Sequence, residues 1–398
     1  MEEFDERLCN VVSTAELERR WENVRKRMRD DNIDVLVAHG SNGYAGGPGH
    51  FRWLTGIPVM NSYAQALVFP QDGMATLVHH GDFGGRKDND PRTPEFRGIG
   101  QRFMTPSFPA ISYCAGYEAG IVAKVIAEQG CARVGMVAPG SAYHGFVHRL
   151  HELVGDARIV DFTDAIDGLK AIKSEEDIAC IRQTAKMQDE ILAEISRFVK
   201  PGMKDFEVMA YAQYLGQLRG SEGGYMIGTS ASEGQPAMIR HRPYQGRTIR
   251  EGDTLMTQCE NSGPGGFFVH LGRLFVLGKA TSRMNDAFAE VLEAQSFTLN
   301  LLKPGPSCRE VFLQFNTYMK ARKLPEERRL HCHGQGYEVV ERPLVRDDES
   351  MPIAAGMNIG IHPSISNASM FVTVCDNFLI TDAAPERLHA TPQRIFEL

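Results

Sequence analysis

Apolar residues recur with two different periods in the first part of the chain. Ser13 and Glu16 fit a capping box, and the helical stripe behind them consists of Leu17, Trp21, Val24 and Met28. A second helix, rich in alanine, isoleucine and valine, is predicted at residues 117–129. Short apolar runs predict buried strands at residues 34–38, 65–69, 75–79 and 134–137. Helices that alternate with strands in this way predict an α/β domain.

The pattern changes near residue 168, where a charged amphipathic helix opens at 169–182 with Ser174 in position to cap it. Beyond this helix, the segment 199–208 (VKPGMKDFEV) recurs as 302–311 (LKPGPSCREV). In both copies a helix ends at Lys-Pro-Gly and another begins with an acidic first turn. Such an echo predicts two related halves that face each other across a cleft. Strands of this part are predicted at 254–259, 273–277, 357–361 and 371–374. We therefore predict an α/β domain at 1–168 and an α+β domain at 169–398.

Composition excludes several classes of protein. A chain of 398 residues that is 42% hydrophobic and 23% charged is an ordinary globular protein with room for two cores. The formal net charge of −7, without a concentrated Lys/Arg patch, argues against nucleic-acid binding. Membrane association is not expected, because no apolar run is long enough to span a bilayer and the acidic N-terminus lacks a signal-peptide core. The eight cysteines show no disulfide-like spacing, so we expect reduced thiols in a cytoplasmic protein.

Several short motifs agree in order and spacing with one protein family. They are 50–56 (HFRWLTG), 169–182, 251–253 (EGD), 333–343 (HGQGYEVVERP) and 356–381 (GMNIGIHPSISNASMFVTVCDNFLIT). Together they resemble the creatinase, methionine aminopeptidase and prolidase superfamily. The resemblance implies an α/β N-terminal domain and an α+β "pita-bread" catalytic domain with an internal pseudo-twofold repeat. It further implies a homodimer that acts on a small-molecule substrate.

The resemblance also locates the metal-binding positions of the family. Its peptidases hold two metal ions with Asp, Asp, His, Glu and Glu; the matching positions here are Gln258, His270, His333, His362 and Cys375. At most one of the four anionic ligands is retained, as the thiolate of Cys375. Two divalent cations held close together need negative ligands to offset their repulsion. We therefore expect that this site does not hold a pair of ions.

Two interpretations of the metal content remain open. His270, His333, His362 and Cys375 are suitable ligands for one divalent transition ion, such as zinc, iron, nickel or manganese. Creatinase, in contrast, keeps the fold without the metal ligands and works with a catalytic histidine. On that pattern the imidazoles would form a neutral polar wall and no metal would bind.

His241 is the candidate general acid and base. It lies in Arg-His-Arg-Pro, eleven residues before Gly252. This spacing resembles that of the substrate-contacting histidine of the peptidases and of the acid/base histidine of creatinase. An imidazole titrates near neutral pH, so it can accept and donate a proton within one catalytic cycle.

Three further residues are expected to act on the substrate. Glu341 matches the glutamate of the family's His-Glu pair, although the preceding histidine is Val340 here. It would orient the substrate or act as a general base; the alternative is a surface ion pair beside Arg342. The resemblance also implies that Gln258 and Tyr337 contact the substrate.

These observations favour a creatinase-like hydrolase that cleaves a C–N or related bond of a small polar metabolite. The alternatives are an Xaa-Pro aminopeptidase or dipeptidase, a non-hydrolytic lyase on the same fold, and a non-catalytic binding module. Retention of His241, His333 and Glu341 argues against the last of these.

Overall fold

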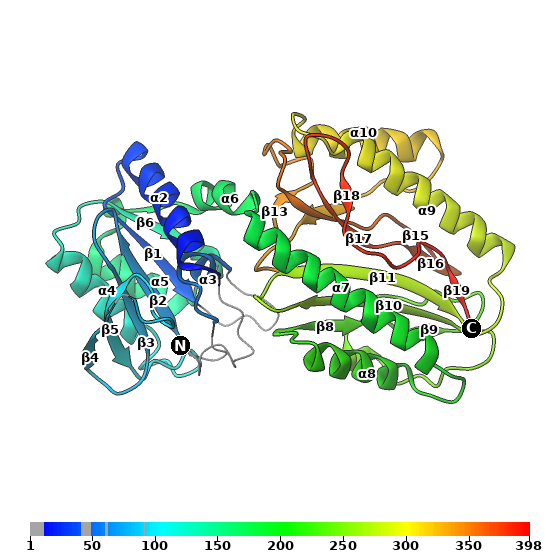
Figure 1. Ribbon diagram of the computed structural model, residues 1–398, viewed down its shortest axis with the longest axis horizontal. Coiled ribbons are helices and arrows are strands. Elements are labelled where there is room, and N and C mark those ends of the chain that lie inside the picture. The colour runs from blue at the N-terminus through cyan, green and yellow to red at the C-terminus, as the bar shows by residue number, and fades with distance from the viewer. Residues whose placement is uncertain (1–11, 41–48, 60–62, 91) are drawn as a thin grey trace. The chain divides into compact units, whose positions relative to one another are not determined.

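The computed structural model describes residues 12–40, 49–59, 63–90 and 92–398 (Figure 1). The chain divides into two compact units, residues 1–170 and 171–398. The sequence placed this division two residues earlier.

The first unit is built on a seven-stranded sheet with the strand order β4-β5-β3-β2-β1-β6-β7. The strands are β1 Val35–Gly40, β2 Gln65–Pro70, β3 Ala75–His80, β4 Gly85–Asp88, β5 Ile99–Thr105, β6 Val134–Val137 and β7 Ile159–Asp161. The helices are α2 Thr14–Asp30, α3 Gly49–Thr55, α4 Tyr117–Glu128, α5 His144–Val154 and α6 Thr163–Ala171. Side chains of β1, β2 and β6 pack against α4 and α5 in one apolar core. The predicted helices and strands of this part correspond to α2, α4, β1, β2, β3 and β6.

Helix α2 begins where the sequence indicated, but with half of the expected capping box. The Ser13 hydroxyl accepts from the Glu16 backbone N–H at 3.0 Å. The Glu16 carboxylate turns away from the cap and pairs with Arg19 and Arg20 instead. Arg20 is fully buried, so the Glu16 carboxylate compensates the charge of its buried guanidinium.

The second unit opens with α7 Glu175–Phe198, whose N-cap Ser174 forms a complete capping box with Asp177. The helix predicted at 169–182 is therefore two helices, because α6 ends at Ala171 before the cap. The capped N-terminus satisfies backbone donors that a continuous helix would have paired internally.

Two five-stranded sheets form the centre of this unit. The first has the order β19-β11-β10-β8, with β9 paired to β10; its strands are β8 Gly223–Ile227, β9 Ser230–Ala231, β10 Thr254–Ser262, β11 Phe268–Val276 and β19 Phe396–Glu397. The second has the order β13-β12-β14-β17-β18; its strands are β12 Cys332–Gly334, β13 Glu341–Leu344, β14 Asn358–Ile361, β17 Asp376–Leu379 and β18 Glu386–Arg387. A separate hairpin joins β15 Ser364–Asn367 to β16 Met370–Thr373.

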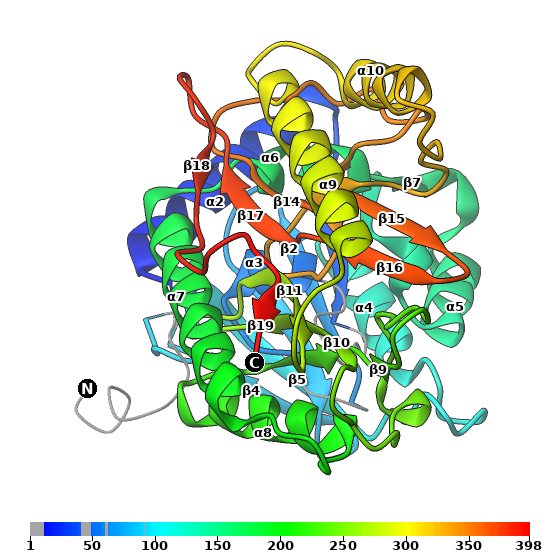
Figure 2. The same cartoon turned by 90° about the vertical axis from the view of Figure 1, so that its right-hand side faces the viewer.

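The predicted repeat is visible as two similar halves. Helices α7 and α8 Asp205–Leu218 pack on the first sheet, whereas α9 Ser282–Leu301 and α10 Cys308–Ala321 belong to the second half (Figure 2). Lys204 and Ser307 stand at the N-caps of α8 and α10, and each forms an isolated β-bridge, to Thr248 and Pro352 respectively. The pseudo-twofold pita-bread architecture is therefore confirmed.

The two sheets are joined at β11 and β17. Gly272 and Cys375 exchange both backbone hydrogen bonds, at 3.1 and 3.3 Å. Beside them, Arg273 donates to Asp376 at 2.7 Å, and neither side chain is exposed. This buried ion pair and bridge hold the inner faces of the two sheets against each other.

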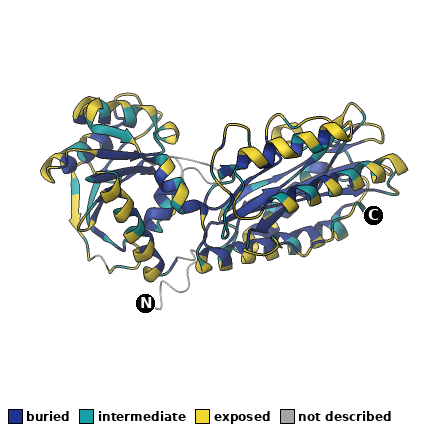
Figure 3. Cartoon of the chain, turned by 90° about the horizontal axis from the view of Figure 1, so that it is seen from above, coloured by how far each residue is buried: buried dark blue, intermediate teal, exposed yellow. Residues whose placement is uncertain are grey.

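Burial follows the layers. Strand residues are mostly buried, and exposed residues lie along the outer sides of the helices (Figure 3). Among the described residues, no helix is both long and apolar enough to cross a membrane. Several polar residues of the inner strands, among them Gln258, His270 and His333, line one cavity.

Candidate active site

The first wall of this cavity is the inner face of the hairpin β10–β11. Gln258 lies opposite Gly272 and Glu260 lies opposite His270 in the antiparallel register. Alternate residues of a strand share a face, so Gln258 and Glu260 point to the same side as His270. The His270 backbone N–H donates to the Asn377 side-chain oxygen at 2.9 Å, which fixes the strand at this point.

The second wall is formed by β12 and β14. His333 pairs with Gly360 across these strands, and His362 follows two residues after Gly360. Gly360 leaves open the space that the His270 ring occupies. A Cβ atom added there would lie 1.8 Å from His270 Nε2. His270 therefore inserts from one sheet between two histidines of the other.

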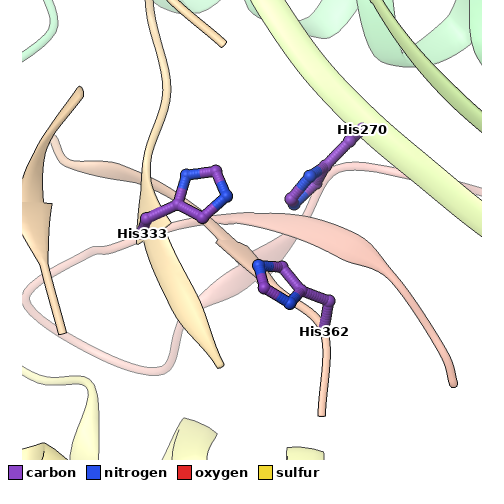
Figure 4. A group of neighbouring side chains, drawn as sticks. All are labelled: His270, His333 and His362. Atoms are coloured by element: carbon purple, nitrogen blue, oxygen red, sulfur yellow. The ribbon is translucent and has the colours of Figure 1, made fainter. Parts of the chain in front are cut away.

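The three imidazoles form a nearly equilateral triangle. The ring centroids of His270, His333 and His362 are 5.2 to 5.3 Å apart. One nitrogen of each ring lies within 4.8 Å of the other two. Figure 4 shows the rings turned toward one another from three separate segments.

Burial favours the neutral form of two of these imidazoles, those of His333 and His362. It lowers the pKa of His333 to about 3 and, with the field of His333 and His270, lowers that of His362 well below its usual value. His333 Nδ1 lies 2.9 Å from the Gly334 carbonyl oxygen, so it carries the proton and leaves the Nε2 lone pair free. Among the described residues, neither ring nitrogen of His270 has a hydrogen-bond partner.

The cavity has a volume of about 440 Å³ and opens beside the triangle. His241 and Gln258 line it together with His270, His333 and His362. His241 is exposed, and its ring meets that of Tyr225 edge-on at 4.9 Å between centroids. His241 and Gln258, both expected from the sequence to act on the substrate, thus share a cavity with three of the four predicted metal ligands.

Cys375 does not join the three histidines, contrary to the sequence-based expectation. Its Sγ points to the His270 carbonyl oxygen at 3.8 Å, and its backbone forms the junction between the sheets. Burial, reinforced by Asp376 and Glu260, raises the pKa of the Cys375 thiol well above its usual value. The thiol therefore stays protonated and packs behind His270.

Glu341 and Tyr337 also lie elsewhere than expected. Glu341 accepts a hydrogen bond from Lys173 in a buried ion pair, and neither residue lines the cavity. Arg342, the surface partner considered from the sequence, pairs with Glu349 instead. Tyr337 is buried and packs its ring on Phe267 at 4.2 Å. The motif correctly located the strand that carries Glu341. It could not show which distant residue the long side chain contacts.

Glu260 is the cavity residue that the sequence reasoning missed. It lines the cavity, and its Oε1 lies 3.7 Å from His270 Nδ1. Burial alone would raise the pKa of Glu260, but the contact with His270 outweighs it and keeps this pKa below its usual value. The signal was present in the sequence, because Glu260 stands two residues after Gln258 in a predicted strand.

Comparison with known proteins identifies the family. Residues 179–382, more than half of the chain, match the description "Metallopeptidase family M24". The chain belongs to this family. It is thereby placed in the creatinase and aminopeptidase P superfamily and is an enzyme of the hydrolase class.

Individual M24 relatives are distant. An uncharacterized hydrolase/peptidase, y4tM of Sinorhizobium fredii, is 24% identical over 399 residues, covering 96% of this chain and 97% of that protein. An Xaa-Pro dipeptidase of Pyrococcus horikoshii is 25% identical over 258 residues, covering 63% of this chain and 72% of the relative. The crystal structure of a prolidase from Thermococcus sibiricus superposes with a TM-score of 0.78 at 17% identity, covering 97% of this chain and all of that one.

The M24 metal pair does not fit these residues. Gln258 carries no charge, burial favours the neutral form of His333 and His362, and Cys375 is a protonated thiol outside the triangle. Within the described residues, Glu260 is the carboxylate that lies beside the histidine cluster, and one negative charge does not offset the four positive charges of two divalent ions. A single ion does fit: three imidazoles with converging nitrogens are a donor set for one divalent transition metal.

Proposed function

We propose that this M24 protein hydrolyses a C–N bond of a small polar metabolite, using one divalent transition ion held by His270, His333 and His362. The convergence of three imidazoles on one point, two of them buried, is the observation that carries this proposal. Zinc, iron, nickel and manganese are the candidate ions. When bound, such an ion supplies Lewis acidity toward water or a substrate oxygen.

His241 is the group that moves the proton in this proposal. It lines the same cavity as Gln258 and Glu260. Its exposure allows it to exchange protons with solvent between turnovers, and its edge-on contact with Tyr225 restrains the ring. Gln258, whose side-chain oxygen has no partner among the described residues, would accept a hydrogen bond from a substrate N–H.

The cavity supports a small substrate with an anionic group. Arg329 lines its rim, and the described residues give the Arg329 guanidinium no ion-pair partner. A free guanidinium is a geometric match for a carboxylate. The volume of about 440 Å³ is that of a metabolite rather than a long peptide.

Xaa-Pro dipeptidase activity is the second candidate, because named relatives carry that activity. Two features of the cavity disfavour it. Four of the five family ligand positions have another residue in place of the family's carboxylate, and Val340 lines the cavity where the family motif has a histidine. We also propose a cytoplasmic homodimer; the seven cysteines within the described residues are all free thiols, which suits a reducing compartment.

A paired assay tests the proposal. Purified protein is loaded with zinc or manganese and offered Xaa-Pro dipeptides and, separately, small carboxylate-bearing amides and amidines. The proposal predicts turnover of the second group alone. Turnover of proline dipeptides that exceeds turnover of every small amide and amidine would reassign the protein to the dipeptidases.

A further inference from the structure

Glu260 occupies a special place in the first sheet. It is the residue of β10 that faces Tyr225 of β8 on one side and His270 of β11 on the other. Its side chain is only 14% exposed, and it opens to the cavity. A carboxylate in such a place needs hydrogen-bond donors or positive charge nearby, because burial of an unpaired anion is costly.

His270 is the group that can meet this need. The two side chains are direct cross-strand neighbours, and the Oε1–Nδ1 distance of 3.7 Å is slightly longer than a hydrogen bond. The other nitrogen, Nε2, lies against Gly360, the residue of β14 that pairs with His333 and stands two residues before His362. Glu260 and Gly360 thus lie at opposite nitrogens of the His270 ring.

We propose that Glu260 is the positioning carboxylate of the three-histidine site: it holds the proton on His270 Nδ1 and so presents the Nε2 lone pair to a single divalent ion. This inference rests on the proposed function, since it assigns the anionic partner of the same site. His333 obtains the same tautomer from the Gly334 carbonyl. Two of the three rings then direct Nε2 inward, each oriented by an acceptor behind it.

The assignment gives this site one carboxylate, although the family's ligand positions in this chain have lost theirs. At position 258 the chain has a neutral amide, and two residues further along the same face it has Glu260. One negative charge is thereby kept near the ion, on a residue that contacts a ligand and not the ion itself. Three neutral ligands and one outer carboxylate leave a net positive site with one dication, which disfavours a second.

Glu327 provides the matched control. It is a second carboxylate that lines the cavity, but it accepts the backbone N–H of Arg329 at 2.7 Å and serves its own loop. Glu327→Gln removes a charge from the same cavity without touching a histidine. Glu260→Gln removes the charge beside His270 and keeps the size of the side chain.

The experiment measures zinc affinity by competition with a chromogenic chelator for the wild type and for both variants. We expect Glu260→Gln to weaken zinc binding by about 10- to 100-fold, the effect of losing an outer partner of a ligating histidine. Glu327→Gln should bind zinc as the wild type does. The melting temperature of metal-free Glu260→Gln should equal that of the metal-free wild type. This result separates positioning of the ligand from a general structural role.

Each outcome has a distinct meaning. Equal zinc affinity of the wild type and Glu260→Gln would overturn the role of Glu260 and leave the proposed function standing. A wild type that binds no zinc, iron, nickel or manganese would remove the proposed metal and Glu260's role together.

A measurement on the wild type avoids dependence on a folded variant. In the zinc-loaded protein, ¹⁵N NMR of labelled histidine should show His270 protonated at Nδ1, with assignment by His270→Gln. Protonation at Nε2 instead would contradict the proposal.

Discussion

Gly360→Ala is the sharpest test of how the site is assembled. The added methyl group would lie 1.8 Å from His270 Nε2, 2.6 Å from Cε1 and 2.7 Å from Cδ2. An ordinary contact begins at 3.4 Å, so the ring would have to move by about 3.4 − 1.8 = 1.6 Å. Metal–ligand distances tolerate deviations of about 0.2 Å, so the displaced ring is lost as a ligand.

The expected result is a loss of zinc affinity of at least about 100-fold, because even loss of an outer partner costs 10- to 100-fold. Crowding of the buried ring should also destabilise the fold by about 1–3 kcal/mol. Isothermal titration with zinc measures the first effect and urea unfolding the second. Gly223→Ala is the control, since a Cβ atom there meets nothing within 4 Å. Zinc affinity of Gly360→Ala within threefold of the wild type would refute the insertion of His270 between the sheets.

Three further results are expected. His241→Ala should abolish turnover while zinc affinity and melting temperature stay unchanged; retained activity would mean that another group moves the proton. Lys173→Met should lower the free energy of unfolding in urea by about 3–5 kcal/mol, because it leaves the Glu341 carboxylate buried without the Lys173 ammonium. The double variant Lys173→Met/Glu341→Leu should recover most of that loss. A Lys173→Met protein as stable as the wild type would contradict this. His331 stacks on Phe315, and burial lowers its pKa to about 3 from 6.5. Because of this depressed pKa, His331 does not affect the free energy of unfolding above pH 6.5 but lowers it as the pH falls toward 3. At pH 5, His331→Leu should therefore remove about 2 kcal/mol of the acid destabilisation. Parallel stability–pH curves for the wild type and His331→Leu would show that His331 titrates normally.

The sequence was informative wherever a motif fixed the backbone. The echo of 199–208 in 302–311 correctly predicted two similar halves, because each copy marks the start of a capped helix. His270, His333 and His362 were found as neighbours by position within matched motifs. Their side chains meet because strand register brings Gly360 under His270, a contact between two sheets that no local pattern encodes.

Three side chains have surroundings that the sequence did not indicate, and the cause is the same for all of them. Cys375 stands at a ligand position of the family, but the junction between β11 and β17 turns its thiol behind His270. Glu341 lies in its predicted motif, yet the distant Lys173 binds it. Glu260 was passed over because the family places no ligand there. In each case the tertiary partner of a side chain, and not its place in the strand, decided its role.

The count of metal ions per chain tests the central claim most directly. Crystals grown with ample manganese, with anomalous diffraction recorded at its absorption edge, would report both number and position. The account predicts one peak between His270, His333 and His362 and none beside Gln258. Two fully occupied peaks would show that the cleft holds the paired ions of the M24 peptidases after all.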